Sequence, residues 1–331
     1  MANWFRSRPK LSIFLGILAG VIILLFVLAL KPFSLKETFT PNPAESYEEA
    51  LRRIQAIRAE EAKLDLRPEC ATQFLSHGAK TDKVIVFLHG FTSCPAQFAE
   101  LAKEYNDRGY NVYIPRLPRH GLNDRLGGPL KGLTAEELAG FANQAADIAQ
   151  GLGDQVIISG LSGGGTMTAY LAQERQDVDV AATMAPFLGI GFIPRPLNRA
   201  FANLGLLIPD VWQWWDPIHK ENDPSASPYD YTRYPLHALL EIMRLGFATE
   251  ADAKRFPPAA GKIISITNAN DPSVNNGVVA EFEQAWREHA GNKLEVFQFD
   301  KSLNLPHNLI GPDQPGFRIE LVYPKLLELI Q

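Results

Sequence analysis

The stretch Gln155-Val156-Ile157-Ile158-Ser159-Gly160-Leu161-Ser162-Gly163-Gly164 decides the fold of this chain. Its first five residues have the length and the branched side chains of a buried strand, and the residues from Gly163 to about Gln173 continue as a helix. Ser162 therefore lies on a tight turn between a strand and a helix, where a strained main chain needs glycines two residues before and two residues after it. This context predicts a nucleophile elbow, which holds the Ser162 hydroxyl exposed above a sheet.

A second stretch supports this interpretation. Lys83-Val84-Ile85-Val86-Phe87-Leu88 is an apolar strand pattern, and it ends in the turn His89-Gly90-Phe91-Thr92. This pattern argues against the alternative that residues 160–164 are a flexible glycine-rich connector. Acyl transfer builds negative charge on a carbonyl oxygen, and fixed backbone N–H groups stabilise that charge. The elbow would supply the Gly163 N–H, and Phe91 N–H is the candidate for the second donor; we expect His89 to form the turn and not to act as a base.

These two stretches together resemble the α/β-hydrolase family, and within it the serine esterases, monoacylglycerol lipases and lysophospholipases. The resemblance covers roughly residues 70–331. It implies a mainly parallel central sheet with helices on both faces. It also implies the chain order nucleophile, acid, histidine. Asp271 follows a predicted strand and fits the acid, and His307 follows the last predicted strand and fits the base. An Asx-type turn before Pro272 is the alternative role of Asp271.

Chemistry explains why these residue types belong together. A neutral serine is a poor nucleophile until an imidazole takes its proton, and a carboxylate behind the imidazole fixes its tautomer. The chain has seven histidines, of which only His307 follows the last predicted strand. His120 lies in another His-Gly turn, to which the resembled family gives a structural role. The predicted catalytic residues are therefore Ser162, Asp271 and His307, and no metal or organic cofactor is implied.

The N-terminal region contains a long apolar run. Leu11 to Leu30 are twenty residues without a charge, and as a helix they would be about 30 Å long, the thickness of a hydrocarbon core. We therefore expect a single transmembrane anchor at residues 11–30. Arg6, Arg8 and Lys10 precede it, so the positive-inside tendency would place residues 1–10 in the cytoplasm and the catalytic domain on the extracytoplasmic side. Cleavage of the run as a signal peptide, which would release a secreted protein, is the alternative.

The rest of the chain divides into a proline-containing segment, residues 31–45, and a large domain, residues 46–331. We expect the first to be a stalk and the second to be the hydrolase domain. The connection between the predicted strands at 178–184 and 262–267 is far longer than a crossover needs, so an insertion lies at about residues 187–250. In the resembled family this position commonly carries a cap. Its three tryptophans, at 212, 214 and 215, predict an apolar wall around an acyl chain or against the sheet.

The two cysteines of the chain are Cys70 and Cys94. They reach the same end of the sheet only if the segment around Cys70 doubles back, and in an oxidising compartment they would then form a disulfide. Two free thiols are the alternative. The sequence has no CxxC motif and no Cys/His cluster, which argues against structural zinc.

Composition limits the remaining classes of function. The 331 residues are 46% hydrophobic and 21% charged, enough for one large α/β domain. The net charge of −5 and the lack of a long Lys/Arg cluster argue against a nucleic-acid partner. The sequence thus predicts a membrane-anchored serine hydrolase of carboxylic esters with medium-chain acyl or monoacylglycerol-like substrates. The alternatives are an acyltransferase or a serine aminopeptidase on the same scaffold, and a non-catalytic binding protein.

Overall fold

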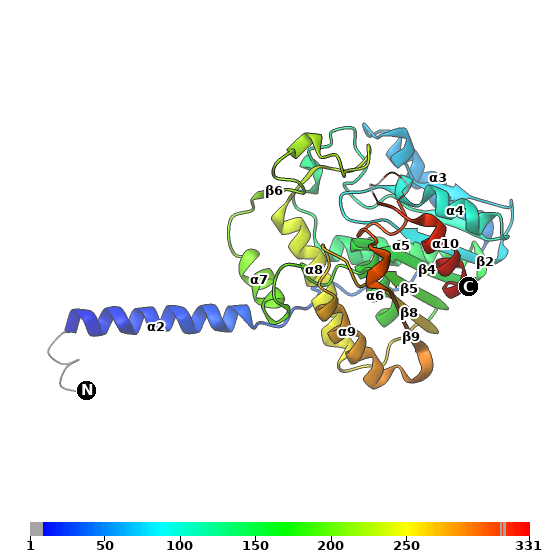
Figure 1. Cartoon of the computed structure of the whole chain (residues 1–331). Helices are drawn as coiled ribbons and strands as arrows, with labels where there is room; N and C mark the ends of the chain where they lie inside the picture. Colours follow the sequence, from blue (N-terminus) through cyan, green and yellow to red (C-terminus); the bar gives the residue numbers. More distant parts are fainter. Residues whose placement is uncertain (1–8, 312, 314–315) are drawn as a thin grey trace.

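The centre of the molecule is a seven-stranded sheet with the strand order β1-β3-β2-β4-β5-β8-β9 (Figure 1). The structure is a computed structural model that describes residues 9–311, 313 and 316–331. β1 pairs antiparallel with β3, and the other neighbouring strands are parallel. The strands of this sheet are β1 (Gln73–Leu75), β2 (Thr81–Leu88), β3 (Asn111–Ile114), β4 (Gly153–Leu161), β5 (Val180–Met184), β8 (Lys262–Asn268) and β9 (Leu294–Phe299).

The sheet separates two hydrophobic cores. Val84, Val86 and Leu88 of β2 lie in one core, and Ile85 and Phe87 lie in the other, because successive side chains of a strand point to opposite faces. Strands buried on both faces produce the nearly continuous apolar run that is seen in this part of the sequence.

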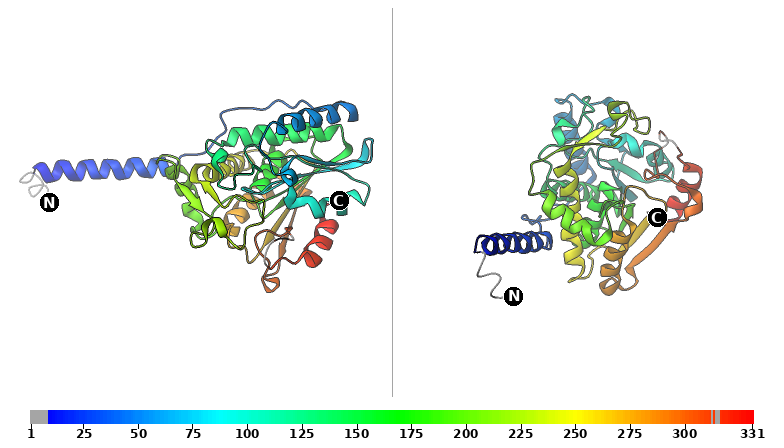
Figure 2. Two further views of the ribbon diagram at one scale, coloured as in Figure 1. Left: turned by 90° about the horizontal axis from the view of Figure 1, so that it is seen from above. Right: turned by 60° about the vertical axis from the view of Figure 1, so that its left-hand side comes forward.

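Helices cover both faces of the sheet, as the sequence predicted. Seen from above, α3 and α5 lie on one side of the sheet and α10 lies on the other (Figure 2). The first core is covered by α3 (Tyr47–Glu61), α5 (Ala135–Gln150), α6 (Gly163–Glu174), α8 (Leu236–Ala253) and α9 (Asn276–His289). The second core is covered by α4 (Ala99–Asn106) and α10 (Ile319–Leu329).

The long connection between β5 and β8 contains regular structure. It includes α7 (Asn198–Gly205) and a small antiparallel sheet of β6 (Trp212–Trp214) and β7 (Arg233–Pro235) before it continues into α8. The predicted insertion, at about residues 187–250, therefore includes most of α8. Buried residues such as Leu240 and Met243 of α8 belong to the first core. The α8 part of the insertion thus belongs to the first core, and β6 and β7 form a sheet separate from the seven-stranded one.

The prediction of a transmembrane anchor at Leu11–Leu30 is wrong. A helix, α2 (Pro9–Ala29), does form and projects from the rest of the chain in Figure 1. A transmembrane helix needs about 20 consecutive and predominantly apolar residues. Within the described residues, none of the helices meets the length and apolarity that crossing a membrane requires.

The end of α2 is held by protein contacts. α2 packs against α7, and Ala29 in its last turn is buried. The side-chain amide of Asn203 in α7 donates hydrogen bonds to the carbonyl oxygens of Ala29 (3.1 Å) and Lys31 (2.9 Å). The C-terminal end of α2 is therefore attached to the domain at Ala29, whereas Val27 and Leu30 stay exposed.

The predicted placement of the chain across a membrane depended on the anchor and is therefore also wrong. The sequence predicted residues 1–10 in the cytoplasm and the catalytic domain on the other side of a membrane. That arrangement requires a spanning helix, and the described residues contain none. Residues 1–8, with Arg6 and Arg8, lie outside the described residues. Cleavage of a signal peptide stays a prediction.

Residues 31–45 lie along the surface of α5 and α8. The ring of Phe33 stacks on that of Phe247 in α8 with 5.9 Å between the centroids. The backbone N–H of Lys36 donates a hydrogen bond to the Glu136 carboxylate of α5 (2.9 Å). The segment that was expected to be a stalk is therefore attached to the domain along part of its length.

Candidate active site

Ser162 is the single residue between β4 and α6, and its backbone has φ 57° and ψ −116°. A positive φ is strained for a residue with a Cβ and persists where the surrounding structure holds it. Here the Ser162 N–H donates to the carbonyl oxygen of Met184 at the end of β5 (2.9 Å), and the Ser162 carbonyl accepts from Phe187 N–H (3.0 Å). Both backbone groups of this strained residue are therefore bound to the chain that leaves the neighbouring strand.

The glycines on either side of Ser162 are needed for close backbone packing. A Cβ on Gly160 would lie 2.3 Å from the carbonyl oxygen of Gly164. A Cβ on Gly164 would lie 1.9 Å from the carbonyl oxygen of Leu88 in β2. Both distances are far below van der Waals contact, so the turn requires glycine at these two positions.

Asp271 and His307 are in direct contact. Nδ1 of His307 donates a hydrogen bond to Oδ2 of Asp271 at 2.7 Å. The Asp271 side chain is 0% exposed and that of His307 is 22% exposed, so the imidazole lies between a buried carboxylate and the surface. The other carboxylate oxygen, Oδ1, accepts from the backbone N–H groups of Ser273 and Val274, each at 2.9 Å. Asp271 thus makes the Asx-type turn and also binds His307, so its two predicted roles are compatible.

The environment of Asp271 favours the charged carboxylate. Burial by itself raises its pKa, but the charge and the hydrogen bond of His307, together with the amides of Val274 and Ser273, outweigh burial and hold the pKa below its usual value. A carboxylate at this place keeps the proton on Nδ1 of His307 and leaves Nε2 as the nitrogen that can accept one.

Asn268, the last residue of β8, connects the loops that carry the acid and the histidine. It is fully buried, and its side-chain amide donates to the carbonyl oxygens of Leu305 (2.8 Å) and Pro306 (3.1 Å), directly before His307. Sequence reasoning missed this residue. Its signal was an amide side chain at the carboxyl end of the strand that leads to Asp271.

The three predicted catalytic residues follow β4, β8 and β9. These strands run parallel, so Ser162, Asp271 and His307 lie at the same edge of the sheet, where ligands of open α/β sheets bind. The hydrogen bonds of the described residues join His307 to Asp271 and include none between Ser162 Oγ and His307. In ligand-free active sites such a bond is often long and tightens when the substrate binds.

The peptide between Gly90 and Phe91 is held in one orientation. Its carbonyl oxygen accepts hydrogen bonds from Nδ1 of His89 (3.0 Å) and from the N–H of Ser93 (3.2 Å). Because a trans peptide is planar, fixing the carbonyl aims the Phe91 N–H in the opposite direction. A Cβ on Gly163 would lie 3.3 Å from the Phe91 nitrogen, so the two predicted oxyanion donors are close neighbours.

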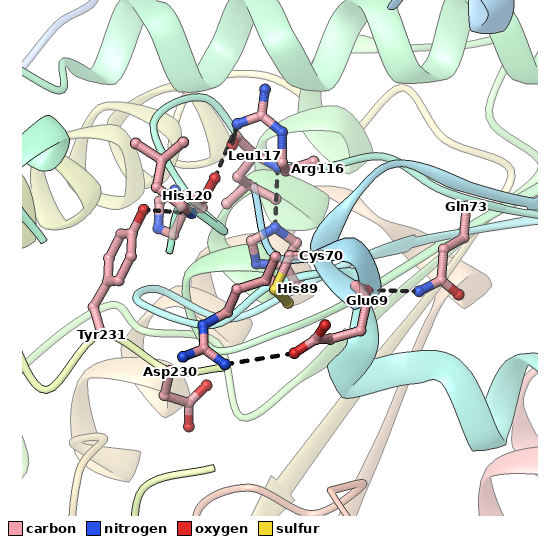
Figure 3. The surroundings of a disulfide bond; sticks show 12 residues. Glu69, Cys70, Gln73, His89, Arg116, Leu117, His120, Asp230 and Tyr231 are labelled. Atoms are coloured by element: carbon pink, nitrogen blue, oxygen red, sulfur yellow. Dashed lines mark hydrogen bonds and ion pairs between the residues drawn. A yellow bond between two sulfur atoms is a disulfide. The ribbon is translucent and has the colours of Figure 1, made fainter. Parts of the chain in front are cut away.

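His89 is a buried and neutral support for this turn (Figure 3). Its Nε2 accepts a hydrogen bond from the N–H of Leu117 (3.0 Å), so its proton is on Nδ1, which donates to Gly90. Burial lowers its pKa well below the ordinary value, and the neighbouring His120 lowers it further. Burial likewise lowers the pKa of His120 to about 4. Both histidines therefore serve the structure of the turn, as the sequence suggested.

The predicted disulfide is present next to this turn. Cys70 and Cys94 are joined at 2.05 Å, with Cys70 at the end of the short helix η1 (Pro68–Cys70), just before β1 (Figure 3). Cys94 is the N-cap of η2 (Pro95–Phe98). Within η2, the side chain of Gln97 accepts the N–H of Gly90 (2.8 Å). The disulfide therefore fixes both the segment that enters the sheet and the helix that follows the turn.

The three tryptophans of the insertion have different surroundings. Trp212 and Trp214 both lie against the guanidinium of Arg233, which is 4.6 Å and 5.5 Å from their ring centroids. Trp215 packs on Tyr234, with 4.3 Å between the centroids, and lies 6.3 Å from the ring of Phe91. Trp215 is thus the tryptophan that reaches the turn at Phe91.

Two cavities are lined by residues other than Ser162, Asp271 and His307. One of about 610 Å³ is lined by Lys83, Arg108 and Tyr110 near the start of β2, and one of about 630 Å³ is lined by Phe39 and Phe141 beside α5. Among the described residues, no group of three or more His, Cys, Asp or Glu side chains could hold a metal ion.

Comparison with known proteins finds related sequences and folds. The profile of the Alpha/beta hydrolase family matches residues 85–307. A thermostable monoacylglycerol lipase of Bacillus sp. (strain H-257) is 28% identical over 187 residues, which are 52% of this chain and 64% of that enzyme. The chain thus matches less than two thirds of the length of this relative.

Solved structures show the same fold at low sequence identity. A structure of the metagenome-derived lipolytic enzymes LipS and LipT superposes with a TM-score of 0.58 and 18% identity, over 80% of this chain and 98% of that one. The monoacylglycerol lipase of Paleococcus ferrophilus superposes with a TM-score of 0.57 and 15% identity, over 78% and 97% of the two chains.

Proposed function

Because this chain belongs to the alpha/beta hydrolase family, we propose that it is a serine hydrolase that cleaves carboxylic esters. The observation that carries the proposal is the hydrogen bond between Asp271 and His307 at the sheet edge that also carries Ser162. The strained backbone of Ser162 supports it, because strain of this kind clusters at functional sites.

In the proposed reaction, Ser162 Oγ attacks the ester carbonyl carbon while Nε2 of His307 takes the serine proton. The carbonyl oxygen becomes an oxyanion, which the N–H groups of Phe91 and Gly163 stabilise. The tetrahedral intermediate then expels the alcohol, which receives the proton from His307, and leaves an acyl-enzyme on Ser162. A water molecule gives a proton to His307 and attacks the acyl-enzyme. The second tetrahedral intermediate then releases the acid, and His307 returns the proton to Ser162 Oγ. Asp271 keeps the imidazole in the required tautomer throughout.

We propose medium-chain acyl esters or monoacylglycerol-like esters as substrates. The Bacillus and Paleococcus proteins named above are monoacylglycerol lipases, which supports this class. The aromatic rings of Phe91 and Tyr234 lie together next to the proposed oxyanion donor and would contact an apolar acyl chain.

A panel of p-nitrophenyl esters from acetate to laurate tests the function. We expect hydrolysis with the highest kcat/KM at intermediate chain lengths, and loss of that activity in Ser162→Ala. A fluorophosphonate probe should label the wild-type protein and not the Ser162→Ala variant. Equal rates for the two proteins would refute a serine hydrolase. Addition of glycerol as a second acceptor distinguishes the acyltransferase alternative, because an acyltransferase would form more glyceride than free acid.

A further inference from the structure

The inserted segment is hydrogen-bonded directly to the turn that carries Phe91. The backbone N–H of Tyr231 donates to the carbonyl oxygen of Thr92 (2.8 Å). The indole N–H of Trp215, at Nε1, donates to Oγ1 of Thr92 (2.9 Å). The same hydroxyl donates to the carbonyl oxygen of Phe91 (2.6 Å). The insertion thus binds both the backbone and the side chain of the residue next to the proposed oxyanion donor.

Thr92 has a backbone conformation that needs such support. Its φ of 68° is in the left-handed region, which is unfavourable for a β-branched residue and persists where neighbouring groups hold it. Thr92 is also buried, at 4% exposed. Its hydroxyl links the Trp215 indole to the backbone of Phe91, so a shift of the indole would be transmitted to the turn.

The Trp215 side chain is itself held in place by the small sheet of the insertion. Its backbone N–H donates to the carbonyl oxygen of Thr232 (3.1 Å), which continues the pairing of β6 with β7. Its ring packs on Tyr234. By contrast, the Trp212 ring packs against the guanidinium of Arg233, and the hydrogen bonds of the described residues include none between Trp212 and Thr92. Trp215 alone of the three neighbouring tryptophans combines a fixed ring with a bond to the turn.

We propose that Trp215 is a positioning residue of the oxyanion turn. Its indole N–H holds the Thr92 hydroxyl, which binds the Phe91 carbonyl oxygen and so holds the peptide between Phe91 and Thr92. This peptide directly follows the one that carries the Phe91 N–H, so holding it restrains the turn that directs this N–H at the oxyanion. The inference rests on the proposed function and adds to it a residue from the insertion that acts through Thr92. Because oxyanion donors act mainly on the transition state, the loss of this bond should lower kcat more than it changes KM.

A double-mutant cycle tests the bond. Trp215→Phe keeps an aromatic ring and removes the indole N–H, and Thr92→Val keeps the branched shape and removes the hydroxyl. With p-nitrophenyl butyrate, each variant should lose about three- to tenfold in kcat, with KM changed less than about twofold. The double variant should be no slower than the slower single variant, because both remove the same link.

Trp212→Phe is the matched control. Trp212 is 38% exposed and Trp215 is 41% exposed, so the two substitutions remove similar groups from similarly exposed sites. The control should keep the kcat of the wild-type protein. Melting temperatures and near-UV circular dichroism establish that each variant is folded; if Thr92→Val does not fold, the kcat of Trp215→Phe measured against the control decides alone.

Three results would overturn the inference. An unchanged kcat in Trp215→Phe would remove the positioning role. A rise in KM at constant kcat would make Trp215 a substrate contact, and multiplicative losses in the double variant would show that Trp215 and Thr92 act separately. These outcomes differ from failure of the proposed function, in which the wild-type protein is no faster than Ser162→Ala.

Discussion

Asp271 and His307 are 36 residues apart in the sequence and share a hydrogen bond of 2.7 Å. The relationship exists because β8 and β9 are adjacent parallel strands, so the loops that follow them leave the sheet side by side. Asn268 at the end of β8 then binds the chain directly before His307. The buried carboxylate and the partly exposed imidazole are the part of the proposed triad with the most direct geometric support.

Replacing Asp271 by Asn should reduce turnover severely. The amide cannot stabilise the imidazolium, and its NH₂ group favours the wrong tautomer of His307, so we expect kcat to fall by about 10³- to 10⁴-fold. Steady-state hydrolysis of p-nitrophenyl butyrate measures the change. Asp300→Asn is the control, because Asp300 lies after β9 and, among the described residues, its side chain accepts hydrogen bonds from the nearby Ser302 and not from His307. A loss below tenfold in Asp271→Asn would contradict the proposed role of the carboxylate.

Asp230 should make the stability of the protein depend on pH. Burial raises the pKa of this carboxyl group from its usual value of 3.8 to about 6, although Ser93, Ser227 and Arg125 oppose the rise. The folded protein therefore keeps this proton more tightly than the unfolded chain, so the contribution of Asp230 to stability is greatest below pH 4 and declines as the pH rises from 4 to 6. The rise of the Asp230 pKa from 3.8 to about 6 corresponds to about 3 kcal/mol of unfolding free energy.

Comparison with Asp230→Asn isolates this contribution from that of other groups. Asp271, whose pKa is lowered, has the opposite effect: its stabilisation is present above the unfolded pKa and is lost as the pH falls. Urea unfolding of both proteins between pH 4 and 8 should show the variant gaining stability relative to the wild-type protein up to about pH 6. A difference that does not vary with pH would argue against the raised pKa.

Removing the disulfide should reduce both stability and activity. For a link between residues separated by 24 positions, the chain-entropy model gives about 3.5 kcal/mol of unfolding free energy. We expect Cys70→Ser/Cys94→Ser to unfold at lower urea concentration and to have a lower kcat, because Cys94 lies three residues after Phe91. Reductant should affect the wild-type protein in the same direction and leave the double variant unchanged. Equal urea midpoints for the two proteins would exclude the stabilising role.

The elbow should not accept a side chain at Gly164. A Cβ there would lie 1.9 Å from the carbonyl oxygen of Leu88, so Gly164→Ala must move the backbone of either β2 or α6. We expect a loss of about 3 kcal/mol or more in unfolding free energy, measured by urea denaturation, together with loss of activity. Gly128→Ala is the control, because its nearest neighbouring atom would be 3.9 Å away. Similar stability of the two variants would show that the turn is less tightly packed than described.

Local features of the site could be predicted because they depend on residues that are close in sequence. The strand before Ser162, the helix after it and the glycines between them follow from hydrophobic periodicity and from the steric needs of one turn. The same holds for the strand that ends at the turn of His89 and Phe91. The family resemblance carried by these two stretches also implied a mainly parallel sheet covered on both faces.

The errors and omissions arose where distant segments meet. The apolar run at Leu11–Leu30 predicted a membrane anchor, whereas no helix of the described residues is long and apolar enough to cross a membrane. Its residues also did not predict the contact between α2 and α7. The sequence also predicted no link between Asn268 and the loop before His307.

The sequence alone determined which residue types are present for ester chemistry and in which chain order they occur. Only the tertiary structure decided that Trp215, and not Trp212, reaches the turn at Phe91. The physical reason is that a local pattern reports the conformation of its own segment, whereas such contacts depend on which strands pair and in which register.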